Sequence, residues 1–427
     1  VYRDSGVEWI GQVPEHWRVT PLKVIAETVN GTTPESGKPE YWDGDIAWYT
    51  PTDIDNEVAS ELGVPRRYIT QAGYESCAVK ISPPGSVILS TRAPIGSVGI
   101  TTIPSTINQG CRTLIPAQDV PTSYLASTLV AAREELRLRG NGTTFQELST
   151  EALRSLRVPM PPRSECVSIA SGLDRETARF DALIAKKTRF IELLKEKRQA
   201  LITHAVTKGL NPKAKMKASG VEWIGEVPEH WVAIKFNHVA RVTEGLVDPK
   251  AHPYREMVLI APNHIESGTG KILGLETAVF QNAESGKYTC KKGAVIYSKI
   301  RPALAKVAIA PCDCLCSADM YPMDCTDRTY PEWLFYLMLS PPFTSWAILE
   351  SDRVAMPKIN RESLADLRVF LPPMDEQLAA VAWLKAQVEK LEIVSLKTQH
   401  SIDLLKERRA AFITAAVTGQ IDLRESA

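Results

Sequence analysis

A long, helix-like segment occurs twice in the chain. Residues 189–207 read RFIELLKEKRQALITHAVT, and residues 400–418 read HSIDLLKERRAAFITAAVT. The two copies start 211 residues apart in a chain of 427 residues, which is half of the chain length. A repeat at this spacing indicates that the molecule contains two copies of one structural plan.

Apolar residues recur around both copies with the spacing of a coiled coil. Steps of three and four residues alternate from Val381 onward, and again from Ala170 onward. This heptad pattern predicts two long helices, each about 65 Å long, that bury a shared seam. Arg198 and Arg409 occupy matching polar positions of the two seams. The apolar residues predicted to contact the other helix or a partner subunit are Leu173, Phe180, Ile184, Ile191, Leu194, Leu201, Val381, Leu384, Val388, Leu391, Ile402, Leu405 and Phe412.

The chain order predicts how the two helices pair. A Pro-Pro pair at residues 161–162 and another at 372–373 precede the helices, and Ser164 and Asp375 are the expected N-caps. The first helix must carry the chain from one globular unit to the next, and the second must run back to bury its seam. We therefore expect an antiparallel coiled coil with a pseudo-twofold relation, in which each helix leads toward the start of the other repeat.

A second duplicated stretch precedes each globular unit. SGVEWIGQVPEHW at residues 5–17 returns as SGVEWIGEVPEHW at residues 219–231, with twelve of thirteen positions identical. The stretch has neither helical nor strand periodicity, so we interpret it as an arm that packs its tryptophans on a fixed surface. No nucleophile or partner base accompanies His16 or His230, which argues against catalysis.

The segments between these repeats read as mixed strands and helices. Residues 42–50 and 85–90 are the clearest strands, residues 124–138 form an amphipathic pattern that stops at Gly140, and residues 332–340 form the corresponding helix in the second half. The expected fold class is α+β, with two similar α/β domains separated by two long helices. The expected domains are residues 1–162, 163–217, 218–373 and 374–427.

Composition excludes several classes of protein. Lys and Arg together number 50, as do Asp and Glu, so no net charge indicates a nucleic-acid or membrane partner. No apolar run approaches the roughly 20 residues of a membrane span, and no signal peptide is evident, so we expect a cytoplasmic protein without a membrane partner. Four of the eight cysteines, Cys312, Cys314, Cys316 and Cys325, crowd together. Their spacing suits a zinc site poorly, and buried thiols beside a strand are the favoured interpretation.

Sequence signals for catalysis are weak. SPPF at residues 340–343 resembles the catalytic tetrapeptide of amino-methyltransferases, but the usual glycine-rich cofactor loop is missing, which favours a helix-terminating turn. SGTGK at residues 267–271 lacks the spacing of a phosphate-binding loop. We therefore expect a protein that is not an enzyme and binds no metal and no cofactor of its own.

Two divergent units on a long helical pair suit a bipartite target such as double-stranded DNA, whose half-sites lie one or more helical turns apart. Basic and amide side chains on the loops are the groups that such a protein needs to contact phosphates and bases. The candidate DNA-binding residues are Arg66, Arg67, Arg92, Asn108, Gln109, Arg112, Thr143, Lys287, Lys291, Lys292, Lys299, Arg301 and Lys306.

The chain resembles the specificity subunit of type I restriction-modification enzymes. The resemblance rests on the two arms, on the PP-(S/D)-E openings at residues 161–165 and 372–376, and on the LLKEKRQALITHAVT and LLKERRAAFITAAVTGQIDL tails. GSVILSTR followed by INQG resembles the centre of that family's target-recognition domains. The match covers essentially the whole chain; Cys166, where the second opening has Gln377, is a mild departure.

The resemblance implies two target-recognition domains, each reading one half of an interrupted DNA site, with the helices as spacer. It also implies two modification subunits that carry S-adenosylmethionine chemistry and restriction subunits that use ATP and magnesium. None of these cofactors would bind this chain. The alternatives are a coiled-coil scaffold that bridges protein partners without reading DNA, and a methyltransferase built around SPPF.

Overall fold

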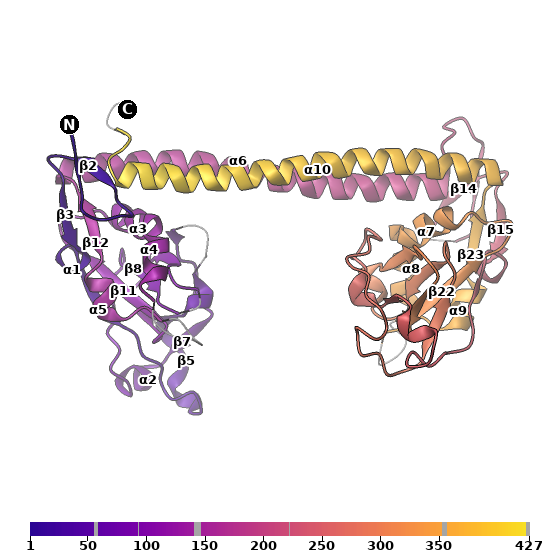
Figure 1. Ribbon diagram of the computed structural model, residues 1–427, viewed down its shortest axis with the longest axis horizontal. Helices are drawn as coiled ribbons and strands as arrows, with labels where there is room; N and C mark the ends of the chain where they lie inside the picture. Colours follow the sequence, from indigo (N-terminus) through magenta and orange to yellow (C-terminus); the bar gives the residue numbers. More distant parts are fainter. Residues whose placement is uncertain (55–58, 93, 141–146, 222, 352–356, 424–427) are drawn as a thin grey trace. The chain divides into compact units, whose positions relative to one another are not determined.

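The computed structural model describes the chain except for residues 55–58, 93, 141–146, 222, 352–356 and 424–427 (Figure 1). The chain forms two compact units. Unit 1 comprises Val1–Thr188 and His400–Ala427, and unit 2 comprises Arg189–Gln399. Each unit contains one globular head and a part of both long helices.

The head of unit 1 contains two sheets. The larger sheet contains β11 (Cys111–Pro116), which pairs antiparallel with β4 (Ala26–Asn30) and with β8 (Val87–Ser90). Its strand order is β4 (Ala26–Asn30), β11 (Cys111–Pro116), β8 (Val87–Ser90), β9 (Val98–Ile100) and β6 (Ser60–Glu61). The smaller sheet has the order β10 (Ser105–Ile107), β5 (Trp42–Tyr49) and β7 (Arg67–Ile69). The helices are α1 (Leu22–Ile25), α2 (Gln71–Glu75), α3 (Thr122–Ala131), α4 (Arg133–Leu138) and α5 (Thr150–Arg154).

The head of unit 2 repeats the central part of this plan. Its larger sheet has the order β16 (Ala240–Val242), β22 (Met320–Cys325), β19 (Val295–Ser298) and β20 (Val307–Ile309). Its smaller sheet has the order β17 (Leu259–Ile260), β21 (Cys314–Ser317) and β18 (Lys287–Cys290). The helices are α7 (Pro331–Leu339), α8 (Pro341–Ser351) and α9 (Arg361–Asp366). The expected α+β fold class is confirmed.

Strand β8 shows why a continuous apolar run forms the centre of each head. All four of its residues are buried. Val87 and Leu89 pack in the core that contains helix α3, whereas Ile88 packs in the core shared with the smaller sheet. Strand β19 does the same, because Val295 and Tyr297 belong to one core and Ile296 to another. A strand covered on both faces needs apolar side chains in both directions.

One helix differs from the sequence prediction. The amphipathic pattern of residues 124–138 predicts a single helix, but α3 ends at Ala131 and α4 begins at Arg133. At the break, the Arg133 side chain packs against Gly96, and its Nε donates to the Gly96 carbonyl at 3.0 Å. The break between α3 and α4 therefore lies where Arg133 contacts the turn between β8 and β9.

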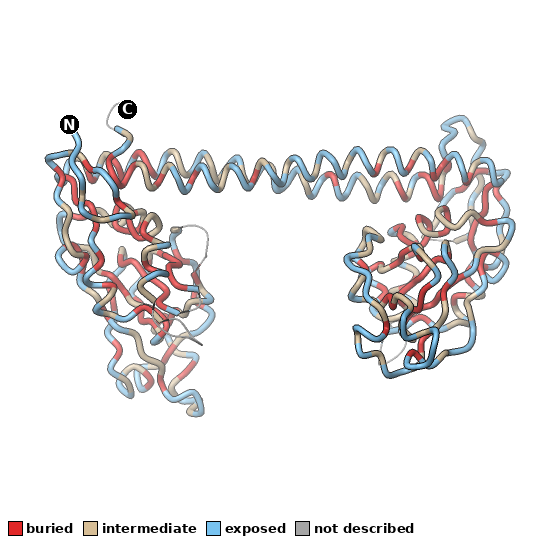
Figure 2. Tube along the Cα trace, viewed as in Figure 1, coloured by how far each residue is buried: buried red, intermediate tan, exposed pale blue. Residues whose placement is uncertain are grey.

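The long helices are α6 (Arg163–Lys208) and α10 (Met374–Val417), with 46 and 44 residues. Within unit 1 they run antiparallel, because Phe180 contacts Phe412 at a ring-centroid distance of 6.2 Å while the next residue, Asp181, pairs with Arg409, which comes earlier in α10. All thirteen predicted seam residues are buried or half-buried, and most of their helical neighbours are exposed (Figure 2). The heptad pattern predicts this distribution.

The polar seam positions are satisfied differently in the two units. In unit 1, Arg409 is buried, its Nε lies 2.9 Å from Asp181 Oδ1, and its Nη2 donates to Oδ2 at 3.2 Å. In unit 2, the equivalent Arg198 donates from both terminal nitrogens to the carbonyls of Gly268 and Thr269, each at 2.9 Å. A buried guanidinium needs such partners, because an unpaired buried charge is strongly destabilising.

Each arm is a short hairpin, which its aperiodic sequence did not predict. Strand β2 (Gln12–Pro14) pairs with β1 (Tyr2–Asp4), and β14 (Glu226–Pro228) pairs with β13 (Met216–Ala218). Just after each hairpin, a strand of the head pairs with the strand that precedes the next long helix. These pairs are β3 (Arg18–Pro21) with β12 (Arg157–Met160), and β15 (Val232–Lys235) with β23 (Arg368–Leu371).

The His-Trp pair of each arm binds a glutamate in the first turn of a long helix. His16 Nε2 lies 2.8 Å from Glu165 Oε1, and Trp17 Nε1 donates to Glu165 Oε2 at 2.9 Å. In unit 2, His230 and Trp231 contact the two oxygens of Glu376 at 2.6 and 3.1 Å. The duplicated histidines therefore have a structural role, because each contacts a glutamate in the first turn of a long helix. The helix dipole also favours a carboxylate at this end of the helix.

The N-caps predicted from sequence are not the residues at which the long helices start. Helix α6 begins at Arg163 and α10 at Met374, so Ser164 and Asp375 lie inside the first turn and the cap predictions are wrong. In each unit, the C-terminal end of the other long helix packs against the same arm tryptophan. Gly419 follows α10 with φ +75° and packs against Trp17, and Gly209 follows α6 with φ +70° and packs against Trp231. A β-carbon is disfavoured at this backbone angle, so glycine is the fitting residue.

We expect Glu165→Ala to lower the free energy of unfolding by about 1–3 kcal/mol, because it leaves the indole N–H of the buried Trp17 without its acceptor. Urea denaturation followed by tryptophan fluorescence measures this change. The control is Glu8→Ala, since Glu8 is an exposed residue of the same arm. Equal stability of the two variants would contradict a structural role for the His16–Glu165–Trp17 contact.

Candidate nucleic-acid interface

Four candidate residues of unit 1 meet where strands β8, β10 and β11 begin or end. Arg92 follows β8 and forms an ion pair with Glu147 at 2.9 Å. Arg112 on β11 donates from Nη1 to the Gln109 carbonyl at 3.0 Å, and Asn108 directly follows β10. The loops are joined by a hydrogen bond from the Thr91 amide to the Gly110 carbonyl. We call this group of loop residues, 91–92, 108–112 and 147–150, the unit-1 rim.

Arg66 and Arg67 lie on an adjoining part of the same head. The Arg67 guanidinium stacks 3.6 Å from the centre of the Trp42 ring, which fixes its direction. The Arg66 amide donates to Asp53 Oδ1 at 3.1 Å. Asp53 ends the turn η2 (Pro51–Asp53), and Pro51 packs against Gly110 of the rim. Thr143, the remaining candidate of this head, lies outside the described residues.

The candidates of unit 2 divide between two ends of strand β19. Lys291 and Lys292 precede the strand and are exposed. Lys299 and Arg301 follow it, where the backbone of Ile300 bridges to Lys358. The structure therefore does not bring the six predicted residues together. We call residues 299–301, 317–321 and 358–361 the unit-2 rim, because they occupy the same place in the fold as the unit-1 rim.

Two lysines predicted as DNA contacts in unit 2 form hydrogen bonds within the fold. Lys287 is buried, and its ammonium donates to Ser285 Oγ at 2.7 Å. Burial lowers the pKa of Lys287 from its ordinary value. Lys287 therefore has a structural contact inside the head, and its role as a DNA contact stays a prediction. Lys306 donates to the Pro262 carbonyl at 2.6 Å and connects the start of β20 to the turn η5 (Pro262–His264).

Arg361 is the rim residue that the sequence reasoning missed. Its guanidinium lies 5.5 Å from the Tyr321 ring centre and 5.6 Å from that of Tyr288. Its Nη2 donates to the Thr243 carbonyl and to the Tyr288 hydroxyl, each at 3.1 Å. Aligning the two halves at the 211-residue offset could have found it, because this offset places Arg361 opposite Thr150 of the unit-1 rim.

The crowded cysteines are divided between the two sheets of unit 2, because Cys325 ends β22 of the larger sheet whereas Cys314 and Cys316 lie on β21 of the smaller one. Cys314 and Cys316 are buried on β21, and Cys290 pairs directly opposite Cys314 on β18. A hydrogen bond with Cys290 and burial together raise the pKa of the Cys314 thiol. The interpretation as buried thiols beside a strand is confirmed for Cys314 and Cys316. Among the described residues, no group of three or more His, Cys, Asp or Glu side chains is arranged to hold a metal ion.

The two sequences weighed as catalytic signals have structural roles. Ser340 of SPPF ends helix α7, is fully buried, and donates to the Leu337 carbonyl at 2.6 Å. The helix-terminating interpretation is therefore confirmed. The SGTGK loop supplies the carbonyl groups of Gly268 and Thr269 that bind Arg198.

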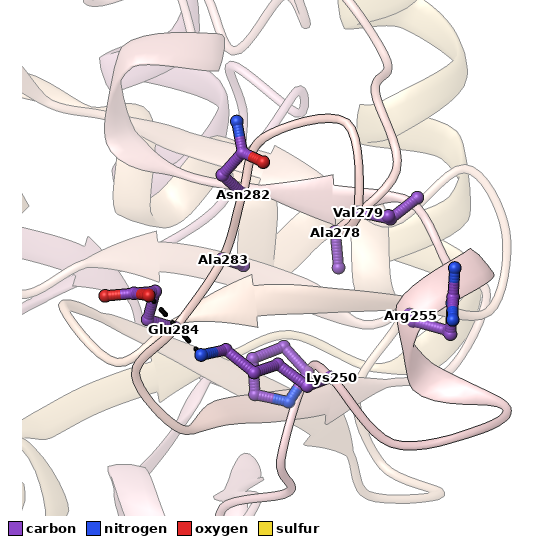
Figure 3. A pocket seen from close by; sticks show the side chains of 8 residues that line it. Lys250, Arg255, Ala278, Val279, Asn282, Ala283 and Glu284 are labelled. Carbon is purple, nitrogen blue, oxygen red and sulfur yellow. Dashed lines mark hydrogen bonds and ion pairs between the residues drawn. The ribbon is translucent and has the colours of Figure 1, made fainter.

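A small hollow of about 270 Å³ lies in the loops of unit 2 (Figure 3). Lys250 and Arg255 contribute its cationic side chains, and Lys250 Nζ lies 3.3 Å from Glu284 Oε1. Val279, Ala278 and Asn282 complete much of its lining. The Lys250–Glu284 ion pair lies at the surface of this hollow, and both side chains are exposed. Among the described residues, no helix combines the length and apolar character that crossing a membrane requires.

Two heads of one fold, each with a polar rim and each attached to an antiparallel helix pair, define a duplicated recognition protein. The sequence matches the family described as type I restriction modification DNA specificity domain twice, over residues 14–193 and 228–404. The chain therefore belongs to this family. The class expected from the arms and helix tails is confirmed.

Curated relatives agree with this assignment. The chain is 29% identical over 371 residues to the type I restriction enzyme EcoDI specificity subunit of Escherichia coli, covering 82% of this chain and 83% of that protein. It is 27% identical over 428 residues to the MjaIX specificity subunit of Methanocaldococcus jannaschii, covering 97% and 96%.

The fold itself also has solved counterparts. A chain from a structure describing complex assembly and conformational transition of the type I R-M system matches with a TM-score of 0.71 at 15% identity, covering 96% of this chain and 99% of that chain. The HsdS subunit from Thermoanaerobacter tengcongensis matches with a TM-score of 0.51 at 14% identity, covering 96% and 98%. At these identities the comparison concerns the fold alone.

Proposed function

We propose that this chain is the non-catalytic DNA-recognition subunit of a type I restriction-modification complex, and that each head reads one half of a bipartite site in double-stranded DNA. The observation that carries the proposal is the duplication of the family domain, with one polar rim on each copy. Basic and amide groups on the rims supply donors for phosphates and base edges. The antiparallel helices set the distance between the two half-sites.

The outward side of the helix pair supports docking of a partner. In unit 1, Leu183 and Leu404 are exposed apolar residues next to the seam. In unit 2, Phe190, Leu193 and Val394 are exposed in the same way. By heptad position these residues lie on one side of each helix pair. On the other side, Arg198 contacts a loop of the unit-2 head, and Arg409 lines a hollow with Arg133 of the unit-1 head. Exposed apolar rows of this kind mark protein interfaces.

We assign this side to the modification subunits, of which two would fit the two repeats. Restriction subunits would complete the complex. S-adenosylmethionine, ATP and Mg²⁺ would bind to these partners and not to this chain, which acts by positioning the catalytic subunits on a chosen DNA sequence.

The test is co-expression of the chain with the modification subunit of its own system, followed by affinity purification and methylation of DNA. We expect the complex to methylate one interrupted sequence, and the modification subunit alone to show no such selectivity. The affinity for DNA should fall steeply with salt, because phosphate contacts release counterions. Retention of sequence-selective methylation without this chain would contradict the proposal.

The docking side has its own variant. We expect Leu193→Glu combined with Leu404→Glu to reduce copurification of the modification subunit at least tenfold, because two carboxylates would be buried in an apolar contact. Circular dichroism should show an unchanged helix content, since both side chains are exposed. The control is Lys195→Glu combined with Lys406→Glu. If the leucine variant copurified as well as this control, the partner would dock elsewhere.

A further inference from the structure

Three polar side chains form a connected group at the rim of unit 1. The Arg112 Nε donates to Thr150 Oγ1 at 3.0 Å, and the Thr150 hydroxyl donates to Asn30 Oδ1 at 3.1 Å. Arg112 lies directly opposite Asn30 in the pairing of β11 with β4. Asn30 is exposed, while Arg112 and Thr150 are half-buried. The group therefore reaches from the sheet to the surface.

The rim of unit 2 holds a group at the same three backbone positions. Arg361 Nη1 donates to Glu244 Oε1 at 3.3 Å, and the Arg361 guanidinium lies 5.5 Å from the centre of the Tyr321 ring. The Glu244 side chain is 86% exposed, so its carboxylate faces solvent. The rings of Tyr321 and Tyr288 both lie next to the Arg361 guanidinium.

The backbone establishes that the two groups are equivalent. Met323 lies opposite Val242 in the pairing of β22 with β16, and the Thr243 amide donates to the Pro322 carbonyl at 2.9 Å. Continuing this register places Glu244 opposite Tyr321, as Asn30 is opposite Arg112. The third members, Thr150 and Arg361, are each the first residue of a short helix, α5 or α9. The preceding residues, Ser149 and Asn360, are both N-caps.

The side-chain types at these equivalent positions differ between the two heads. The guanidinium comes from the strand in unit 1 (Arg112) and from the helix in unit 2 (Arg361). The outermost group is a neutral amide in unit 1 (Asn30) and a carboxylate in unit 2 (Glu244). A neighbouring position changes sign as well, because Glu147 bridges to Arg92 where Lys358 bridges to Ile300. A purely structural contact in one shared fold would not require the polarity to change at three linked positions together.

We propose that these two groups, Asn30–Arg112–Thr150 and Glu244–Arg361–Tyr321, determine which base pair each head accepts at one position of its half-site. The inference rests on the proposed function. A guanidinium donates to guanine, an amide pairs with adenine, and a carboxylate accepts a hydrogen bond from an exocyclic amino group. Glu244 is an acceptor only, so unit 2 requires an amino-bearing base, cytosine or adenine, at the position that it contacts.

The first experiment uses Glu244→Gln in the full chain, co-expressed with the modification subunit. The amide can donate as well as accept, so discrimination at one base pair of one half-site should weaken about tenfold or more. Methylation mapping measures the sequences accepted. The matched control is Glu362→Gln, an exposed acid next to Arg361 that lies outside the group. We expect the control to retain the original specificity.

The second variant transplants the unit-1 group into unit 2 as Glu244→Asn, Tyr321→Arg and Arg361→Thr. If the variant folds, we expect its altered half-site to prefer the base pair that the unit-1 head prefers. Because Tyr321 is buried, the exposed Glu244→Gln variant decides the matter if the triple variant fails to fold. Wild-type specificity in Glu244→Gln would overturn this inference. Absence of selective methylation by the wild-type complex would instead overturn the proposed function.

Discussion

Removing one heptad from each long helix is expected to shorten the spacer between the two half-sites by about three base pairs. The deletions are residues 186–192 of α6 and 397–403 of α10, which are equivalent in the repeat and contain matching seam residues. Seven helical residues correspond to about 10 Å, and one base step rises about 3.4 Å. Removing a whole heptad keeps the seam in register, because the heptad is the repeat of the coiled coil.

Binding to the original site should then fall at least a hundredfold, since about 10 Å is roughly a third of a helical turn of the duplex and the heads would no longer face the original half-sites. Methylation mapping of the shortened protein gives the new spacer directly. The matched control exchanges residues 186–192 with residues 397–403 and so keeps both helix lengths. An unchanged spacer after the paired deletion would show that the helices do not set the distance.

The long helices could be predicted because their pattern is local. A residue such as Leu384 is followed by apolar partners at steps of three and four, and this periodicity needs no knowledge of the rest of the fold. The duplication then provided the pairing direction. The predicted caps, Ser164 and Asp375, place the helix starts too late, because the helical hydrogen bonds already begin at the carbonyls of Pro162 and Pro373.

The rims were predicted only in part, for the same physical reason. Arg92 and Asn108 follow buried strands, so a position at a strand end was a sound expectation. Lys287 looks like a surface lysine in sequence, yet the pairing of its backbone with Val247 places it in the interior. Arg361 was missed because its contacts with Thr243, Glu244 and the two tyrosines join residues that are far apart in sequence. No local sequence pattern predicts such contacts.

The second prediction with a large expected effect tests whether each head recognises its half-site independently of the other. Replacing residues 18–150 with the equivalent segment of a relative should change one half-site completely and leave the other unchanged. Each head has its own cores on both sides of its central strand, and the cores of the two units share no residue. Changes in one core should therefore leave the other rim intact, since energetic effects of distant, separate sites add independently.

The junctions of this exchange are chosen from the fold. Residue 18 opens β3, and residue 150 opens α5, so the arm, strand β12 and both long helices stay native. The His16–Glu165–Trp17 contact and the exposed apolar side of the helices are therefore retained. A control exchange that starts and ends at the same residues but reinserts the native segment should restore the original site.

Methylation mapping of a host that carries the exchanged chain with its own modification subunit tests the central claim most directly. The account predicts a methylated sequence in which one half is new, the other half is original, and the spacer length is unchanged. A change in both halves, or methylation at the original sequence alone, would contradict the account of two independent reading heads on a fixed helical spacer.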